Sequence, residues 1–389
     1  MDRRVTRRGV LAAAGIALAG CTDNGDDQPV RTPLPGEERE PLSNTWQSLG
    51  RDDGNTGAVA GISGPYIEVD AEWQFDVGGA IVGGPVFGEN TLYAGTVDGE
   101  VYALDTHVGA ERWSFSADGP VSTTPVVDDG LVAVGSSDGH IYGIDADDGT
   151  ELWRFDTAVR VDSSPAIDDQ YVYAGSVSNA AYAIDRTSGE LHWRFDADGS
   201  VLASPAVGDE TVYVASTDHN VYAIDPDSGD ADWQFTTGGE VSVAPTLVDD
   251  RLYVGSRDSS VYAIATDSGE GRWSFGLEAA VASSPAVLGD RLFVGAADHN
   301  LYALGIGDDS PEGLWRSPTP GVAVGNPAVT DDHVFFGGRD GAVRALRTDG
   351  GDRSWEHDVD GGIQGGPALT DRWLYVGTDA GIVYAFRAG

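Results

Sequence analysis

The stretch DGHIYGIDADDGTELWRFDT, residues 138–157, decides the fold because the chain nearly repeats it at a constant distance. Residues 98–117 read DGEVYALDTHVGAERWSFSA, and residues 218–237 read DHNVYAIDPDSGDADWQFTT. Apolar and polar residues alternate in each copy, which is typical of strands. The Asp-Gly pair at 138–139 is a strong hairpin signal, because both turn residues accept a positive φ. Each copy therefore predicts two antiparallel strands, here IYGID and ELWRFD.

Tryptophan and proline positions show that the chain contains eight such units. The tryptophans step by 40 residues, with a single step of 42, and are Trp73, Trp113, Trp153, Trp193, Trp233, Trp273, Trp315 and Trp355. A proline keeps the same spacing from Pro85 to Pro367. Each unit offers four short strands and no helical spacing, and four-stranded units repeated radially form a β-propeller. We expect each tryptophan to be buried between neighbouring sheets, with its N–H bonded to nearby backbone.

The two ends of the repeat array predict how the ring closes. The first tryptophan strand, EWQFDV at 72–77, has no three strands before it, and the last unit ends in IVYAFRAG without a tryptophan strand. If the N-terminal strand completes the last blade, no sheet edge is left unpaired at the seam. The sequence thus predicts an all-β fold, an eight-bladed β-propeller of four-stranded antiparallel blades over residues 72–389, closed by the N-terminal strand.

The charge of the chain limits its partners. It has 63 acidic residues against 23 basic ones, all of them arginine, and a formal net charge of −40. Such a surface repels nucleic acid and anionic lipid. In about 1 M salt the screening length falls to roughly 3 Å, so this self-repulsion is largely removed. Abundant carboxylates without lysine resemble the proteins of halophilic archaea, and we expect a monomeric protein adapted to concentrated salt.

Residues 1–21 resemble an export signal. Arg7 and Arg8 precede a short apolar run that ends at Ala19, a pattern similar to a twin-arginine signal peptide. The following LAGC resembles a lipobox, in which Cys21 would accept a lipid; the alternative is a chance cysteine in a cleaved peptide. Residues 22–43 are polar, acidic and proline-rich, as in a disordered tether. We therefore expect a lipid-anchored protein on the extracellular face of the cell membrane.

The repeat also resembles a known family. The pattern YAIDxxSGExxWRF is similar to the repeat of the pyrroloquinoline quinone (PQQ) propellers, and the resemblance covers residues 73–389. The lead-in segment, residues 44–71, contains WQSLGRDDGNTG at 46–57, which resembles the stretch before the propeller in such proteins. The resemblance implies eight blades but not one activity, because the family includes quinoprotein dehydrogenases and non-enzymatic lipoproteins of outer-membrane barrel assembly.

The innermost strands are where a cofactor site is expected. We place them just before the repeated prolines, where most residues are small, and the polar candidates to line an axial channel are Asp162, Gln364 and Asn326. Quinone and Ca²⁺ would need several carboxylates or carbonyls, a base and a catalytic aspartate. This set has one carboxylate and no base, and the chain cannot form the adjacent cysteine pair of the dehydrogenases. The turn DADDG lacks the distal glutamate of a calcium loop.

The seventh unit departs most from the repeat. It has a two-residue insertion before Trp315, Arg344 in place of a tyrosine, and Arg339, Arg347 and Arg353 nearby. This pattern is either sequence drift or a partner-binding blade. Taken together, the sequence predicts a binding or scaffold protein without catalytic, cofactor or metal residues, whose protein partner it does not identify. The alternative is a PQQ-dependent oxidoreductase, or a degenerate relative of one, with PQQ and Ca²⁺.

Overall fold

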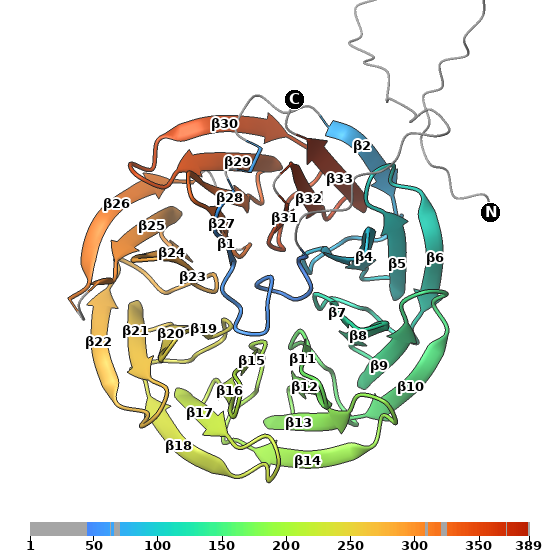
Figure 1. Ribbon diagram of the computed structural model, residues 1–389, viewed down its shortest axis with the longest axis horizontal. Helices are drawn as coiled ribbons and strands as arrows, with labels where there is room; N and C mark the ends of the chain where they lie inside the picture. Colours follow the sequence, from blue (N-terminus) through green and yellow to red (C-terminus); the bar gives the residue numbers. More distant parts are fainter. Residues whose placement is uncertain are drawn as a thin grey trace, which may run out of the picture.

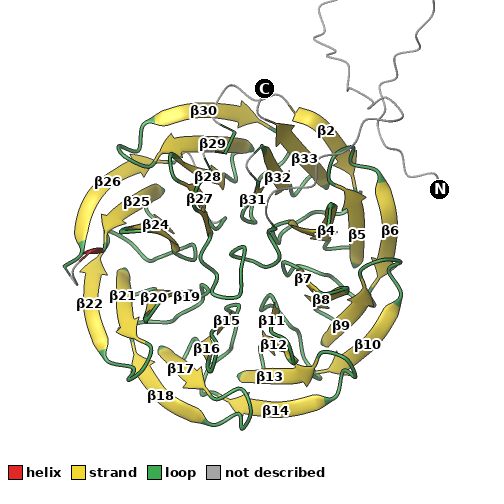
Figure 2. Cartoon of the chain, viewed as in Figure 1, coloured by secondary structure: helices red, strands yellow, loops and turns green. Residues whose placement is uncertain are grey.

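The computed structural model describes residues 45–62, 64–65, 71–307, 310–319, 325–370 and 372–387. Within these residues the strands form eight sheets arranged radially around one axis (Figure 1), joined by short loops (Figure 2). The predicted eight-bladed, all-β propeller is confirmed. Arg7, Arg8, Cys21 and the tether at 22–43 lie outside the described residues. In the described part, no helix has the length and apolar character needed to cross a bilayer.

Each blade is built outward from the axis in chain order. The innermost strands are β3 (Val86–Gly88), β7 (Val126–Asp128), β11 (Ala166–Ile167), β15 (Ala206–Val207), β19 (Thr246–Val248), β23 (Ala286–Leu288), β27 (Ala328–Thr330) and β31 (Ala368–Leu369). The second strands are β4 (Thr91–Gly95), β8 (Leu131–Gly135), β12 (Tyr171–Gly175), β16 (Val212–Ala215), β20 (Arg251–Gly255), β24 (Arg291–Ala296), β28 (His333–Gly337) and β32 (Trp373–Gly377). The third strands are β5 (Glu100–Asp105), β9 (His140–Asp145), β13 (Ala180–Asp185), β17 (Asn220–Ile224), β21 (Ser260–Ala265), β25 (Asn300–Gly305), β29 (Ala342–Arg347) and β33 (Ile382–Arg387). The outer strands of the first seven blades are β6 (Glu111–Ser116), β10 (Glu151–Asp156), β14 (Leu191–Asp196), β18 (Ala231–Thr236), β22 (Gly271–Gly276), β26 (Glu312–Pro318) and β30 (Arg353–Asp358).

The eighth blade joins the two ends of the chain. Its outer strand is β2 (Ala71–Asp76), which pairs antiparallel with β33 and places Trp73 opposite Ala385. Figure 1 shows the blue β2 beside the dark red β33. The predicted closure by the N-terminal strand is therefore confirmed, with the strand beginning at Ala71 rather than residue 72. Because this strand is supplied from the other end of the chain, the seam has the same four-stranded ladder as the other blades.

Each tryptophan fastens its blade to the next one. The indole N–H of Trp113 donates to the Ala146 carbonyl oxygen at 2.9 Å, and that of Trp153 donates to the Arg186 carbonyl oxygen at 2.9 Å. The ring packs against a glycine of the same turn: a Cβ added at Gly149, where φ is +77°, would lie 2.7 Å from the Trp113 ring. This glycine is needed both for its positive φ and for the missing side chain.

Two tryptophans show what happens where the repeat is interrupted. Trp355 would need an acceptor on a turn beyond the last strand of the chain, and its N–H instead donates to the Pro65 carbonyl oxygen at 2.9 Å. Trp273 Nε1 has no acceptor among the described residues. The acceptor of most other tryptophans lies 33 residues further along the chain. For Trp273 this position is Ile306, at the start of the turn that the two-residue insertion before Trp315 lengthens.

The position of the innermost strands corrects one prediction. The sequence placed them just before the repeated proline, but they begin after it: β7 starts at Val126, and residues 121–124 before Pro125 are loop. The proline has no N–H to give to a ladder, and the backbone groups before it bond to the neighbouring blade instead. The residues proposed to line an axial channel therefore lie on the loops that lead into the innermost strands.

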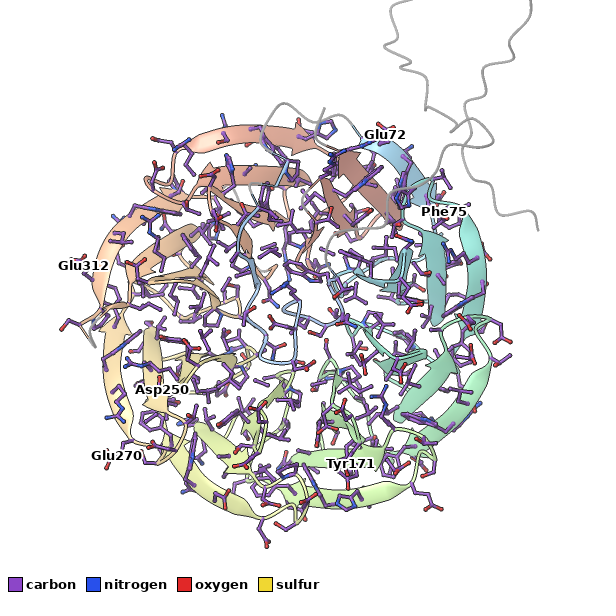
Figure 3. The ribbon with its side chains drawn as sticks, viewed as in Figure 1. Glu72, Phe75, Tyr171, Asp250, Glu270 and Glu312 are labelled. Atoms are coloured by element: carbon purple, nitrogen blue, oxygen red, sulfur yellow. The ribbon has the colours of Figure 1, made fainter. Side chains whose placement is uncertain are left out.

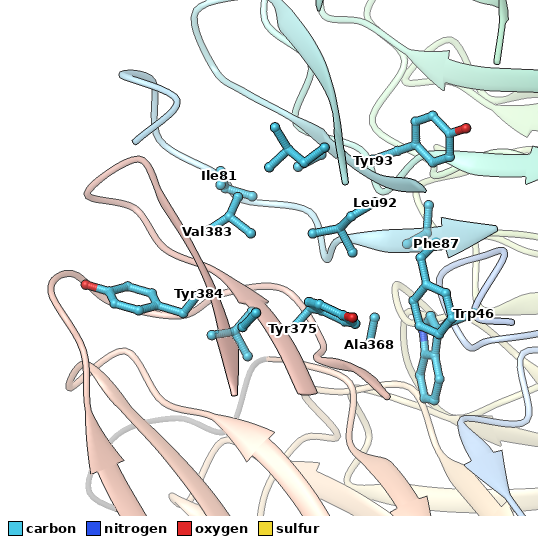
Figure 4. Close-up of a cluster of buried hydrophobic side chains, with 14 of the residues drawn as sticks. Trp46, Ile81, Phe87, Leu92, Tyr93, Ala368, Tyr375, Val383 and Tyr384 are labelled. Atoms are coloured by element: carbon cyan, nitrogen blue, oxygen red, sulfur yellow. The ribbon is translucent and has the colours of Figure 1, made fainter. Parts of the chain in front are cut away.

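The lead-in segment runs inside the ring. We call residues 45–62 the strap, and Figure 1 shows its blue trace crossing the centre of the disc. It contributes β1 (Ala58–Val59), which pairs parallel with β27 and makes that sheet five-stranded. Trp46 of the strap is 3% exposed and packs among the hydrophobic residues that join the first and eighth blades, beside Phe87 (Figure 4).

The strap satisfies the inner edges of six blades. In each, the amide of the second residue after the repeated proline donates to a strap carbonyl oxygen at 2.7–2.9 Å. The pairs are Phe87 to Trp46, Val127 to Gln47, Val207 to Asp53, Leu247 to Gly54, Val287 to Thr56 and Val329 to Gly57. The buried Asn55 side chain adds hydrogen bonds to the carbonyl oxygens of Pro205 and Pro245. The strap thus covers one end of the axis and pairs edges that would otherwise lack partners.

Asp53 of the strap is held in an acidic neighbourhood. Burial, in the first place, and the charges of Asp52, Asp128, Asp168 and Asp169 raise the pKa of its carboxyl from 3.8 to about 6. Asp128 is the last residue of the innermost strand β7, and Asp168 directly follows β11. This neighbourhood places the strap at the end of the ring formed by the turns between first and second strands. We call this end of the ring the strap face.

Replacing an inter-blade tryptophan tests the docking. Trp153 is 6% exposed, whereas its neighbour Leu152 on the same strand is 52% exposed. We expect W153A to lower the free energy of unfolding by about 3–5 kcal/mol through loss of buried contacts and a cavity. L152A should change it by about 0.5 kcal/mol or less. Denaturant midpoints followed by circular dichroism would measure both, and equal midpoints for the two variants would contradict the assignment.

Replacing Asp53 tests the charge on the strap. Its pKa is higher in the folded chain, so its stabilisation is complete below the unfolded value of 3.8 and is lost as the pH rises through about 6. The asparagine in D53N does not titrate, so this variant has no such loss. Between about pH 4 and pH 7 its free energy of unfolding should therefore increase relative to that of the wild type. Denaturant midpoints across this range would show it. D250N, at a side chain that is 81% exposed, is the control, and a constant difference for D53N would refute the explanation.

Candidate functional site

Around the axis, the small residues before each proline form a tight ring. The position directly before the proline takes part in hydrogen bonds to the neighbouring blade at 2.8–2.9 Å. The bonds are Gly84 N–H to Thr124 Oγ1, Thr124 N–H to Ser164 Oγ, Ser204 O–H to the Ser164 carbonyl oxygen, and Ala244 N–H to Ser284 Oγ. At the seam, a Cβ on Gly84 would lie 2.6 Å from the Gly366 carbonyl oxygen. These positions hold neighbouring blades together and do not present side chains to a ligand.

The three sequence candidates have different environments. Asn326 belongs to the ring of inter-blade bonds, because its Oδ1 accepts a hydrogen bond from the Ser284 amide at 2.9 Å. Asp162 and Gln364 lie three residues before their prolines, two residues earlier in the loop than Asn326 does in its own, and are partly exposed. Asp162 is paired with Arg160 at 2.9 Å, and Gln364 Oε1 accepts from Arg339 at 3.3 Å. The structure therefore gives the latter two side chains arginine partners.

These arginines lie on the face opposite the strap. There, the loop into each innermost strand runs beside the turn between second and third strands, as the bond from Arg257 N–H to the Glu240 carbonyl oxygen shows. Arg160 is on such a loop, and Arg257 and Arg339 occupy the same position of such turns in the fifth and seventh blades. Arg257 Nε lies 3.5 Å from Glu240 and 3.4 Å from Ser242 Oγ. We call the loop that carries Arg160 and the two turns that carry Arg257 and Arg339 the arginine loops.

Sequence reasoning noted Arg339 only as part of the irregular seventh unit and missed Arg160 and Arg257, because it searched for site residues only just before the proline. A usable signal was present: SRDS at 256–259 and GRDG at 338–341 put an arginine at the same place in two repeats of a chain with few bases. Acidic residues dominate elsewhere, and Figure 3 shows Glu72, Glu270 and Glu312 at the outer rim of the disc. The arginines of these loops are therefore a local departure from the charge of the chain.

The described residues do not fit a quinone held by Ca²⁺. Calcium takes six to eight oxygen ligands, several of them carboxylates. Among the residues that the structure describes, no group of three or more histidine, cysteine, aspartate or glutamate side chains is arranged to hold a metal. The turn aspartates considered as calcium ligands are used locally: Asp145 Oδ1 accepts from the amides of Asp147 and Asp148.

The irregular seventh blade is explained largely by local ion pairs. In other blades a tyrosine donates to an aspartate four residues earlier, as Tyr142 does to Asp138 at 2.8 Å. Burial, in the first place, raises the pKa of Tyr142 to about 12, so its hydroxyl keeps the proton it donates. Arg344 replaces this tyrosine and bonds the equivalent Asp340 through two nitrogens, at 3.0 and 2.5 Å. It also reaches Glu356 at 2.8 Å.

Two further arginines of this blade are also paired. Arg347 lies 2.9 Å from Asp349, and Arg353 lies 2.5 Å from Glu356. The substitution at 344 thus exchanges a neutral hydrogen bond for a charged one with the same acceptor. This arrangement favours drift over a partner-binding surface for these three arginines and leaves Arg339 as the exception.

Comparison with known proteins gives the family. A family model described as outer membrane protein assembly factor BamB matches residues 68–178, 137–248, 236–361 and 321–389. These matches span all eight blades. The chain belongs to this family. No curated protein matches the sequence.

Solved structures share the fold of the family at low identity. BamB from Moraxella catarrhalis is 19% identical with a TM-score of 0.72, covering 82% of this chain and 100% of that one. Quinohemoprotein alcohol dehydrogenase from Comamonas testosteroni is 14% identical with a TM-score of 0.77, covering 90% and 81%. The computationally designed Ika8 protein is 17% identical with a TM-score of 0.71, covering 88% and 99%. At such identities the likeness shows the fold, and an assembly factor and an enzyme both share it.

Two substitutions at Arg344 test the role of the seventh blade. R344Y restores the repeat's hydrogen bond to Asp340. Its free energy of unfolding should lie within about 1 kcal/mol of the wild-type value. R344L leaves Asp340 and Glu356 without this partner, and we expect a cost of about 2 kcal/mol, below that of a fully buried pair because both acids are partly exposed. Denaturant midpoints would measure the costs. If R344L were as stable as R344Y, the ion pair would not support this blade.

Proposed function

We propose that the chain is a membrane-tethered, extracytoplasmic propeller that binds protein partners as a non-catalytic scaffold. One observation carries the proposal: the positions nearest the axis are small residues used for bonds between blades, as with Thr124 and Ser164. An enzyme needs groups whose charge or proton changes at the reacting atoms. The described hub offers backbone contacts and hydroxyls already used to hold the ring, whereas a rigid ring with many exposed loops suits binding.

The membership in the BamB family supports this reading, because the family description names an assembly factor. The anchor is also part of the proposal. Cys21 in LAGC would carry a lipid, and Arg7 and Arg8 would direct export of the folded chain. Residues 22–43 would then separate the ring from the bilayer. The absence of lysine and the charge of −40 support folding and function in concentrated salt.

A quinone-dependent oxidoreductase remains the second candidate because of two observations. The fold is shared with a quinohemoprotein alcohol dehydrogenase, and the arginine loops would supply cationic groups for an anionic cofactor. Against it stands the lack of a described metal-holding cluster. The scaffold function is therefore our first choice.

One purification can test both candidates. We expect two negative results from the chain purified from membranes in molar salt. It should not bind PQQ with Ca²⁺ stoichiometrically, and it should not reduce a redox dye. Crosslinking in the same salt-matched membranes should join it reproducibly to at least one other protein, identified by mass spectrometry. Stoichiometric quinone binding with dye reduction would overturn the scaffold function, as would the absence of any crosslinked partner.

The localisation has its own control within this experiment. C21S cannot accept a lipid on sulfur and should be recovered outside the membrane fraction, with the circular dichroism spectrum of the wild type. Wild-type-like membrane association of C21S would contradict lipid anchoring and leave the binding result to be judged separately.

A further inference from the structure

The two faces of the ring are not equally available to a partner. The strap covers the axis on one face through hydrogen bonds to six blades. The 44 residues before Thr45 attach to the strap beside Trp46, which bonds Phe87 of the first blade. If these residues carry the proposed anchor, the strap face is the tethered face. The face with the arginine loops is then the one turned toward other proteins.

Bases are scarce in this chain, and most described arginines are neutralised at short distance. Seven of them lie 2.5–2.9 Å from a carboxylate: Arg154, Arg160, Arg186, Arg194, Arg344, Arg347 and Arg353. Arg316 is likewise paired with Glu278. Such pairs leave little of the guanidinium's hydrogen-bonding capacity for a second anion.

Two residues of the arginine loops, Arg257 and Arg339, differ from these pairs. Within the described residues, no carboxylate lies at ion-pair distance from Arg339, whose side-chain contact is the neutral amide of Gln364 at 3.3 Å. Arg257 is 61% exposed, and its contact with Glu240 is long at 3.5 Å. Arg160 is 56% exposed and keeps one short contact, to Asp162. The guanidinium groups of Arg257 and Arg339 therefore retain donors for an external acceptor.

The chemistry of that acceptor follows from the charge of the whole chain. The planar donor fork of a guanidinium matches the geometry of a carboxylate and of a phosphate. A dense polyanion, such as nucleic acid or an anionic membrane, is repelled over a longer range by a chain of net charge −40. One or two carboxylates on an otherwise neutral polypeptide avoid most of this repulsion and still form bidentate pairs at contact.

We propose that Arg257 and Arg339, assisted by Arg160, bind glutamate or aspartate side chains on an exposed segment of a partner protein. This inference rests on the proposed scaffold function and names the surface that it uses. The two main arginines come from equivalent turns of the fifth and seventh blades, so the segment would lie across the loops around the axis. The strap would prevent the same segment from docking at the other end.

A peptide titration tests the proposal on the full-length chain. The probe is a fluorescein-labelled Gly/Ser decapeptide with two glutamates, and the control peptide has glutamine at both places. Fluorescence anisotropy is measured at one fixed salt concentration. We expect the glutamate peptide to bind the wild type at least tenfold more tightly than R257Q/R339Q, and the glutamine peptide to bind neither.

The matched control is R272Q, which removes an exposed arginine from the outer strand β22 of the fifth blade. It should bind the glutamate peptide as the wild type does. Circular dichroism verifies that all variants are folded. Equal affinities for the wild type and R257Q/R339Q, an equal loss in R272Q, or no binding of the glutamate peptide at millimolar concentration would overturn the proposal.

PQQ itself carries carboxylates and is added as a competitor to distinguish a peptide site from a cofactor site. Displacement of the peptide by micromolar PQQ would overturn the assignment to a protein segment. The crosslinking experiment separates this inference from the scaffold function. If a partner is crosslinked equally by wild type and R257Q/R339Q, the binding surface is wrong but the scaffold function stands. If the wild type crosslinks no partner, the scaffold function itself fails.

Discussion

The packing of each outer-strand indole against the next blade's glycine is the contact on which the rest of the structure depends. Trp113 lies against Gly149 and donates to the Ala146 carbonyl oxygen, and equivalent contacts recur around the ring. Because the glycine has no side chain, the flat indole ring can pack directly on its Cα, and the two sheets approach closely. The hydrogen bond from the indole N–H fixes the position of one sheet relative to the other. Because each blade is fastened to the following one, the seventh blade needs a substitute acceptor where the chain ends, and Pro65 supplies it to Trp355.

Close packing at the periphery has a consequence at the centre. Eight innermost strands meet around one axis, and their leading loops hold residues so small that hydroxyls and backbone amides bond directly between blades, as Ser204 does with Ser164. The ionisable side chains Arg257 and Arg339 lie instead on the turns between the second and third strands, beside these leading loops. The strap uses the remaining backbone donors of the inner edges, so one end of the axis is closed by the chain's own lead-in. The ring is therefore different on its two faces although its blades are alike.

The acidic character of the chain makes the location of each arginine informative. Where Arg344 replaces a tyrosine, the aspartate that accepts the hydrogen bond is retained, so the blade tolerates the change without leaving an unpaired buried charge. Arginine at the turn position shared by residues 257 and 339 has no such structural task. The same residue type thus stabilises a blade at one place and remains available for recognition at another, and the difference is in its neighbours.

The sequence by itself determined the number of blades, their strand order, the docking tryptophans, the positive-φ glycines such as Gly149 and Gly189, and the closing strand. Each is set by local alternation or by a period that can be read along the chain. It did not determine that the strands begin after the proline, that Asn326 joins two blades, or that Arg160 and Arg339 pair with Asp162 and Gln364. Only the tertiary structure decided these and the path of the strap, because they depend on contacts made when the ring closes, and the strap has no repeat from which its partners could be read.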